Sequence, residues 1–269
     1  MIPAGFDYHA PRTVPDALRL LGDLGPDAKL IAGGHSLLPM MKLRFAEPRH
    51  LIDLGRIDSL RGIALAGDEI RIGAMTTEHD LLNSTLLADK VPLLVEGART
   101  IADPQVRYKG TIGGDISHGD PGNDHPALML ALDASFVLQG PRGERVVPAD
   151  GYFVALYTTQ AQADEILVQI RIPVPPPGTG GSYQKLKRKT GDFATAASAV
   201  LLQMAGGKVT RASIALTNVA SSTALPTRLA MDACDPLPDL RGDADYKRAM
   251  CGEMTRRAIR TAAARAQGQ

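Results

Sequence analysis

Apolar residues recur with two different periods along this chain, and the changes of period predict alternating helices and strands. Behind Thr13, which suits a helix N-cap, apolar residues follow at helical spacing up to Leu24. Short apolar runs bounded by turn residues then predict four strands, over residues 28–34, 50–57, 61–68 and 69–75. The first 75 residues therefore predict an α/β arrangement.

The middle of the chain first favours helices and then strands. Residues 76–102 carry paired leucines at helical spacing with Pro92 between them, so we expect two consecutive helices, the second ending near Ala102. Another helix is expected over residues 127–134. Strand-like runs separated by turn residues follow at 135–140, 143–153 and 165–175.

A segment rich in proline and glycine, residues 173–181, separates the strands before it from those after it. The composition of "PVPPPGTGG" suits a linker. We therefore predict two domains, over residues 1–176 and 177–269, an organisation that the length of the chain allows.

Beyond this linker, the sequence predicts strands and one long helix. The strands flank a turn at Gly206–Gly207. The helix extends over residues 244–267, and we expect Met250, Met254 and Ile259 to face inward from it.

Composition narrows the classes of function. The 269 residues include 30 Lys and Arg against 29 Asp and Glu, so the formal net charge of +1 gives no field that would attract nucleic acid or anionic lipid. Cys234 and Cys251 lack metal-ligand spacing and are too few for a disulfide framework, which fits a reducing compartment. The first residues do not read as a signal peptide, and no apolar run reaches membrane-spanning length. We expect a cytoplasmic protein.

Two glycine pairs are the best candidates for chemistry. The first lies in "AGGHS" and the second in "TIGGD", that is, in Ala32, Gly33, Gly34, His35 and Ser36, and in Thr111, Ile112, Gly113, Gly114 and Asp115. Glycine lets successive backbone N–H groups converge on an anion. Hydroxyl groups beside each pair would add donors, and Asp115 would accept from ribose or ribityl hydroxyls. Two such loops suit a pyrophosphate, whereas the alternative is that each pair is simply a tight turn.

Other motifs are absent or weak. Neither glycine pair has the spacing of a P-loop or a Rossmann turn. His118 and His125 flank a Gly-Pro loop without a third ligand, so no metal site is expected. No Ser-His-Asp order or G-x-S-x-G elbow supports a hydrolase, and we predict no catalytic residue in this chain.

Three long stretches, residues 31–44, 101–130 and 183–200, closely resemble one family. It comprises the FAD-binding medium subunits of the molybdenum iron-sulfur flavoproteins, the xanthine dehydrogenase and carbon monoxide dehydrogenase family, and the similarity is closest to the carbon monoxide dehydrogenase type. The resemblance extends over nearly the whole chain. It implies an α+β fold of the vanillyl-alcohol-oxidase (PCMH) type, with two α/β subdomains, followed by a C-terminal domain with a three-stranded antiparallel sheet and helices.

The resemblance also assigns residues to the cofactor. The loops Ala32–Ser36 and Thr111–Asp115 would hold the FAD pyrophosphate. Asp124 would bond the adenosine ribose or nearby polar groups, and Leu167 would contact the adenine side. Lys185 would lie near the flavin ring, where its charge favours the anionic reduced form, unless it belongs to a solvated basic cluster.

Phe193 corresponds to an aromatic residue that covers one face of the isoalloxazine in related carbon monoxide dehydrogenases. The familiar residue there is tyrosine. Phenylalanine can stack but donates no hydrogen bond, so tuning of the flavin by a hydroxyl group would be absent. The alternative is that Phe193 only fills core space.

The activity implied is that of a flavoprotein subunit in an oxidoreductase complex, with no substrate chemistry of its own. Partner subunits would carry the molybdenum cofactor and two iron-sulfur clusters, assembled as a dimer of heterotrimers, a heterohexamer. The complex would oxidise carbon monoxide with water to carbon dioxide and reduce a quinone-like acceptor, with peripheral docking at a membrane as an option. The alternatives are an aldehyde, purine or N-heterocycle dehydrogenase of the same family, an FAD-free assembly module, or a free-standing flavin oxidase.

The chain departs from the family pattern over residues 221–239. Relatives carry a longer helical segment at this place. We therefore expect a shortened C-terminal domain, and we expect FAD binding to survive because both glycine loops lie far upstream.

Overall fold

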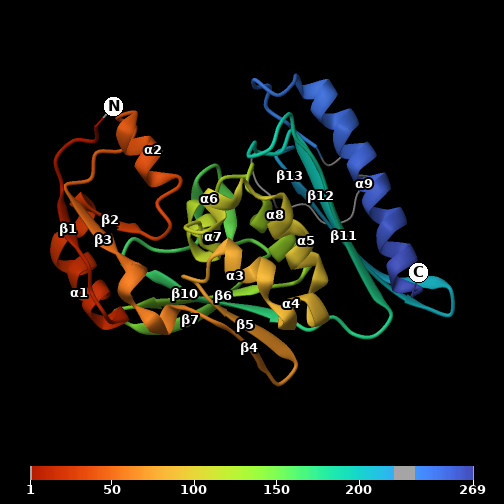
Figure 1. Cartoon of the computed structure of the whole chain (residues 1–269), viewed down its shortest axis with the longest axis horizontal. Coiled ribbons are helices and arrows are strands. Elements are labelled where there is room, and N and C mark those ends of the chain that lie inside the picture. The colour runs from red at the N-terminus through yellow and green to blue at the C-terminus, as the bar shows by residue number, and fades with distance from the viewer. Residues whose placement is uncertain (1, 221–233, 269) are drawn as a thin grey trace.

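Three larger sheets and one two-stranded hairpin organise the computed structural model, which describes residues 2–220 and 234–268 (Figure 1). The first sheet is parallel, in the order β1–β3–β2, and consists of β1 (Asp7–His9), β3 (His50–Asp53) and β2 (Ala28–Ile31). Helices α1 (Val14–Leu24) and α2 (Leu37–Lys42) complete this first lobe. The Thr13 side chain caps α1 by accepting a hydrogen bond from the Asp16 amide, as its position before the helix predicts.

The second sheet has five antiparallel strands, and β10 lies at its centre. The order is β4–β5–β10–β6–β7, formed by β4 (Ile63–Ala66), β5 (Glu69–Gly73), β10 (Ile166–Pro173), β6 (Ser135–Gly140) and β7 (Gly143–Pro148). The strand expected over residues 143–153 is interrupted, since β7 ends at Pro148 and a separate hairpin of β8 (Phe153–Ala155) and β9 (Thr158–Thr159) follows.

Six short helices lie between β5 and β6 in the chain. They are α3 (Glu78–Asn83), α4 (Thr85–Lys90), α5 (Pro92–Thr100), α6 (Pro104–Arg107), α7 (Ile112–His118) and α8 (Asp124–Ala131). The expectation of two helices over residues 76–102 is wrong, because Ser84 ends α3 and its hydroxyl caps α4. The break at Pro92 is confirmed, since α5 begins there.

The third sheet is antiparallel and belongs to the C-terminal part. It contains β11 (Thr179–Leu186), β12 (Ala196–Ala205) and β13 (Lys208–Thr217), with the expected glycine turn between the last two. Helix α9 (Ala244–Ala266) lies against β11 and β12, while α5 and α8 contact the sheet from the central part of the chain (Figure 1). Ile259 was expected to face inward from α9, but its side chain is exposed, whereas Met254 is buried.

The segment expected to be a linker is shorter than residues 173–181. Strand β10 ends at Pro173 and β11 begins at Thr179. Gly180 belongs to this strand because α9 crosses it so closely that a Cβ atom would collide with the Ala262 carbonyl oxygen. Close packing, rather than a loop, therefore accounts for a glycine in this part of the segment.

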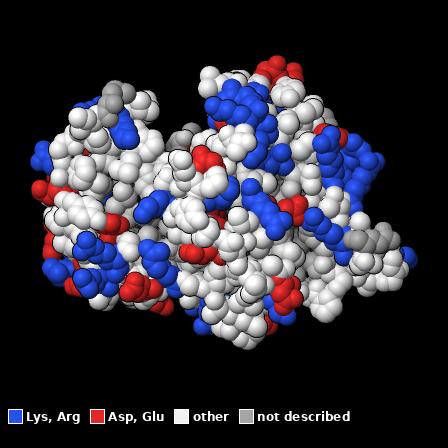
Figure 2. All heavy atoms as spheres, viewed as in Figure 1, with Lys and Arg blue, Asp and Glu red and all other residues white. Residues whose placement is uncertain are grey.

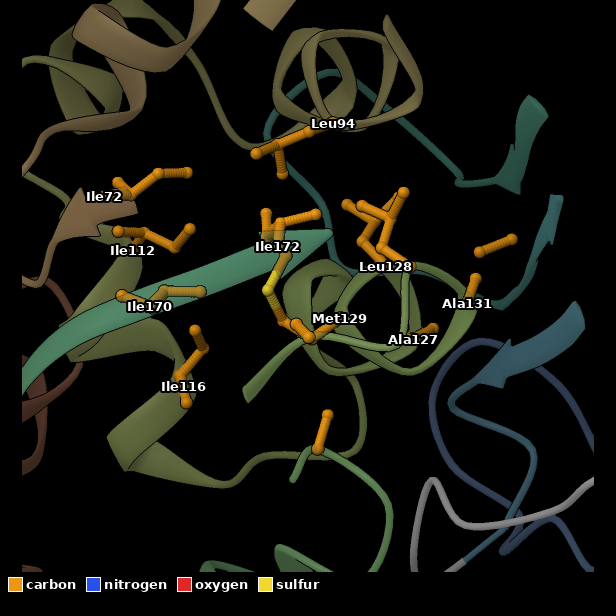
Figure 3. Packing of buried hydrophobic residues seen from close by; sticks show 14 of the residues in the cluster. Ile72, Leu94, Ile112, Ile116, Ala127, Leu128, Met129, Ala131, Ile170 and Ile172 are labelled. Atoms are coloured by element: carbon orange, nitrogen blue, oxygen red, sulfur yellow. The ribbon is translucent and has the colours of Figure 1, made fainter. Parts of the chain in front are cut away.

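The second and third sheets share one buried core. A continuous apolar cluster joins the five-stranded sheet, α5, α7 and α8 to Tyr183, Ala197, Ala199 and Ala215 of the third sheet. Figure 3 shows its central part, where isoleucines of β5, α7 and β10 lie close to Leu128 and Met129 of α8. The C-terminal sheet is thus packed onto the rest of the protein instead of forming a separate body.

The surface agrees with the balanced composition. Acidic and basic side chains are interspersed over much of the face in Figure 2, and basic side chains gather along α9. None of the helices that the structure describes is long and apolar enough to span a membrane. Most of the segment expected to be shortened, residues 221–233, lies outside the described residues.

Candidate functional site

A cleft of about 540 Å³ passes between the first lobe and the helices beside the five-stranded sheet. Segments from β2, α7, α8, β10 and β11 form its walls. It brings together nearly all the residues singled out from the sequence: Ala32, Gly33, Gly34, His35, Ser36, Thr111, Gly113, Gly114, Asp115, Asp124, Leu167, Lys185 and Phe193.

Ile112 does not line this cleft. Its side chain is fully buried in the core, near Ile72 and Ile170 (Figure 3). Its amide donates to the Thr76 carbonyl oxygen at 3.1 Å, within the usual range for such a bond. Ile112 therefore anchors the second glycine loop from behind.

The first glycine loop offers unused backbone donors. Among the described residues, the N–H groups of Gly33, Gly34, His35 and Ser36 have no hydrogen-bond partner. Gly34 adopts a φ of 76°, a left-handed conformation that glycine tolerates at no steric cost. Consecutive amides in such a turn form the concave arrangement that binds anions. The His35 ring instead folds back, with Nδ1 2.9 Å from the Gly33 carbonyl oxygen.

The second glycine loop is built differently from the expected repeat of the first. The Gly113 amide donates to the Ala74 carbonyl oxygen, and the Gly114 amide donates to the Thr111 hydroxyl, which caps α7. A Cβ atom on Gly113 would lie 2.6 Å from the Ala74 carbonyl oxygen. Glycine is needed here for close packing on the neighbouring segment, so this loop supplies a firm wall rather than a second set of free amides.

The two loops touch, and this contact makes them parts of one site. Gly33 lies so close to the Lys109 carbonyl oxygen that any Cβ atom would overlap it. Ala32 lies against Gly114, since a Cβ atom built on that glycine would be 3.3 Å from the Ala32 Cβ. The free amides of the first loop and the Thr111 hydroxyl of the second therefore face a common space.

Asp115 places an unsatisfied acceptor on this wall. Its Oδ1 atom is buried and has no hydrogen-bond partner among the described residues. Burial raises the pKa of this carboxyl to about 7; His125 opposes the shift, and Glu78 and Asp124 add to it. A buried carboxyl oxygen without a partner is costly, and a ligand hydroxyl group would satisfy it.

Behind Asp115, a buried ion pair links two helices. The Nε2 atom of His125 in α8 lies 2.8 and 2.9 Å from the two carboxyl oxygens of Glu78 in α3. Burial lowers the pKa of His125, but Glu78 and the nearby aspartates outweigh it and raise this pKa to about 9. The Glu78 amide also donates to the Gly110 carbonyl oxygen, so the pair supports the start of the second loop.

Asp124 and Lys185 form a second buried ion pair. Lys185 Nζ lies 2.6 Å from Asp124 Oδ2, and the Tyr183 hydroxyl donates to the other carboxyl oxygen. The resemblance assigns Asp124 to the adenosine side and Lys185 to the flavin ring, yet the two side chains are in direct contact. Lys185 is also not part of a solvated cluster, because its side chain is only 2% exposed.

Several polar and aromatic residues of the cleft were not predicted as cofactor contacts from the sequence. Ser117, His118, Asn123 and Tyr157 all line it, and the rings of His118 and Tyr157 are 5.0 Å apart. The polar run "ISHGDPGNDHP" contains three of them and could have indicated them. Tyr157 comes from the β8–β9 turn, whose sequence gives no such signal.

Comparison with known proteins identifies the family. Residues 4–175 match the model of the FAD binding domain in molybdopterin dehydrogenase, and residues 181–230 match the C-terminal domain of the carbon monoxide dehydrogenase flavoprotein. This chain belongs to that FAD-binding family. The resemblance inferred from the three motifs is confirmed, and so are the fold that it implied and FAD as the cofactor of this subunit type.

Individual relatives agree over nearly the whole length. The carbon monoxide dehydrogenase medium chain of Hydrogenophaga pseudoflava is 55% identical, over 98% of this chain and 99% of its own. The medium chain from Afipia carboxidovorans is 50% identical, over 99% of both. The structure of the Hydrogenophaga pseudoflava enzyme matches with a TM-score of 0.95, over 98% of this chain and 99% of that one. Quinoline 2-oxidoreductase from Pseudomonas putida 86 matches at 0.91 with 30% identity, over 99% of both chains.

Proposed function

We propose that this chain is the FAD-carrying medium subunit of a molybdenum hydroxylase that oxidises carbon monoxide with water to carbon dioxide, two electrons and two protons. The observation that carries the cofactor role is the row of unused amides at Gly33–Ser36, held against the second loop inside the cleft. The substrate rests on similarity, since the two carbon monoxide dehydrogenase medium chains are 55% and 50% identical, whereas a nicotine 6-hydroxylase medium subunit is 35% identical.

We assign the diphosphate of FAD to the first loop. The amides of Gly33 and Gly34 would donate to its oxygens, with those of His35 and Ser36 beside them, because these four consecutive donors have no partner among the described residues. The hydroxyls of Ser36 and Thr111 would add donors. Asp115 would accept from a ribityl or ribose hydroxyl through its unsatisfied Oδ1.

Three further residues that line the cleft have proposed roles: Leu167, Phe193 and Lys185. Leu167 on β10 would contact the adenine side, and Phe193 would cover one face of the flavin ring. The flavin would experience the ion pair of Lys185 and Asp124 rather than a lone positive charge, because the Asp124 carboxylate balances the charge of the Lys185 ammonium group. FAD, when bound, accepts electrons from iron-sulfur clusters of a partner subunit and releases them to an external, quinone-like acceptor.

The assembly is part of the same proposal. A large subunit would carry the molybdenum cofactor and a small subunit two iron-sulfur clusters, in a cytoplasmic dimer of heterotrimers. Within this chain, residues 1–176 would form the FAD-binding domain and residues 177–269 the C-terminal domain. The large subunit would contain the substrate pocket, so this chain would perform no substrate chemistry alone.

The test is to purify the native complex through a tag on this chain and to record its absorbance spectrum, its iron and molybdenum content, and its reduction by carbon monoxide. Bleaching of the flavin band by carbon monoxide is the expected result. If flavin and both metals are present without bleaching, the substrate is wrong and aldehydes, purines and N-heterocycles are tried next. A complex with metals but no flavin would instead support an assembly module, and a flavin-containing chain without partners would support a free-standing oxidase.

A further inference from the structure

We propose that Arg241, from the C-terminal part of the chain, is a positioning residue that holds Phe193 at the wall of the cleft. Phe193 is the aromatic side chain that the proposed function places against the flavin, so this inference rests on that function. Arg241 lies 48 positions further along the chain and does not line the cleft itself.

The loop that carries Phe193 is fixed by one buried carboxylate. Asp192 lies directly before it, lines the cleft and is 8% exposed. Its Oδ2 atom accepts from Arg188 Nε at 2.8 Å, and its Oδ1 atom accepts from Arg241 Nη2 at 3.2 Å. The same Oδ1 atom also accepts from the Phe193 amide at 3.0 Å. Asp192 therefore connects the backbone of Phe193 to both guanidinium groups.

Arg241 also contacts the Phe193 ring directly. Its guanidinium carbon lies 5.5 Å from the ring centre, within the range of a cation–π interaction. The Arg241 side chain is 19% exposed, which limits the screening of this contact by water. Phe193 is 44% exposed and has no hydroxyl group, so no hydrogen bond of its own side chain fixes the plane of its ring.

The position of Arg241 is itself determined by α9. Arg241 lies in a turn where the Asp239 amide donates to the Gly242 carbonyl oxygen, and Asp239 accepts from the Lys247 ammonium group at 3.0 Å. Lys247 belongs to α9 and is buried, and Asp243 caps that helix. A chain of contacts thus links the C-terminal helix to the cleft: Lys247 of the helix bonds to Asp239, Asp239 to Arg241, and Arg241 to Asp192, which lines the cleft. No residue of the helix itself lines the cleft.

The first experiment compares FAD release from the tagged complex carrying Arg241→Met with release from the unmodified complex. Release on dilution is followed by the rise of flavin fluorescence. We expect FAD to leave about two to five times faster, the size of effect of a partly exposed cation–π contact. Arg248→Met is the matched control, because Arg248 also lies near the start of α9 but pairs with Asp245 at the surface.

A double-mutant cycle with Phe193→Leu separates positioning from a general loss of stability. If Arg241 acts through Phe193, the double variant releases FAD no faster than Phe193→Leu alone. The visible circular dichroism of the bound flavin should also change in Arg241→Met and recover partly in Arg241→Lys, which keeps a cation beside Asp192. These signals report the surroundings of the flavin rather than the stability of the fold.

Two results would overturn the inference. One is an additive effect of the two substitutions, and the other is a release rate in Arg241→Met that equals the control. An unmodified complex without flavin would instead contradict the proposed function itself. The two failures are therefore distinguishable in the same experiment.

Discussion

The buried pair of Glu78 and His125 gives the sharpest prediction for stability, and His125→Gln is the substitution that tests it. The side chains of His125 and Glu78 are 0% and 3% exposed, and the ring nitrogen contacts both carboxyl oxygens. Removing one partner of such a pair leaves the other charge buried without compensation, which costs about 3 to 5 kcal/mol. We expect the free energy of unfolding of the full chain to fall by this amount at pH 7.

The same pair predicts how stability changes with pH. The pKa of His125 is about 9 in the folded protein, against an ordinary value of 6.5, so the folded state binds more protons between these two pH values. This stabilisation is fully present below pH 6.5 and is lost as the pH rises through 9. At 1.36 kcal/mol per pKa unit, the unmodified chain should lose roughly 2 to 3 kcal/mol between pH 7 and pH 9.5.

Urea unfolding at a series of pH values measures both effects. The chain contains no tryptophan, so far-ultraviolet circular dichroism is the suitable signal. His79→Gln is the matched control: His79 lies next to Glu78 on the same helix and bonds to Asn83 rather than to a carboxylate. The reasoning is refuted if His125→Gln loses stability between pH 7 and pH 9.5 as steeply as the unmodified chain does.

Three further predictions concern the cleft. Gly33→Ala should abolish FAD retention by the purified complex, measured as flavin absorbance, because the added Cβ atom would overlap the Lys109 carbonyl oxygen. The control Gly22→Ala should retain this absorbance, because there is open space around Gly22. Lys185→Met should lower the free energy of unfolding by about 3 to 5 kcal/mol in urea titrations, since it leaves the Asp124 carboxylate buried without its cation. FAD affinity should decline above pH 7 as Asp115 becomes charged beside the place proposed for the diphosphate. Isothermal titration of the flavin-stripped complex should find this decline absent in Asp115→Asn.

Local patterns allowed much of the fold to be predicted. The α1 cap at Thr13, the short strands of the first two sheets and the glycine turn between β12 and β13 all follow from signals within a few residues. The boundary between α3 and α4 was missed because Ser84 can continue a helix or cap the next one, and only the structure decides which. Gly180 was misread as part of a loop because the helix that crosses it lies some eighty residues further along the chain.

Of the candidate site, the two glycine loops could be predicted from the sequence, because glycine is needed where backbone groups come close to a ligand or to another segment. Glycine pairs beside hydroxyl residues indicated the loops, yet the sequence could not tell free amides from amides already bonded to the neighbouring segment at Ala74 and Thr76. The ion pair of His125 with Glu78 could not be predicted either, because Glu78 is 47 residues away in the sequence. Its place in the first turn of a helix is an ordinary one for an acidic residue. Bonds between residues far apart in the sequence distinguish a bonded amide from a free one, and a buried ion pair from an ordinary helix acid. Residue type alone does not reveal such bonds.

The contrast between the two glycine loops bears on how the cofactor is held. The first loop has four consecutive N–H groups without a partner among the described residues, whereas the amides of Ile112 and Gly113 in the second loop are bonded to residues 74–76. The Glu78–His125 pair also supports the second loop. Donors that have no internal partner are stabilised when an anion arrives, whereas a loop whose bonds are already made changes little on binding. The first loop should therefore gain most from FAD, and hydrogen exchange of its amides should slow on binding while that of the second loop stays nearly constant. If the amides of both loops instead gained equal protection from hydrogen exchange, the proposal that the first loop donates to FAD while the second serves as a rigid wall would be wrong.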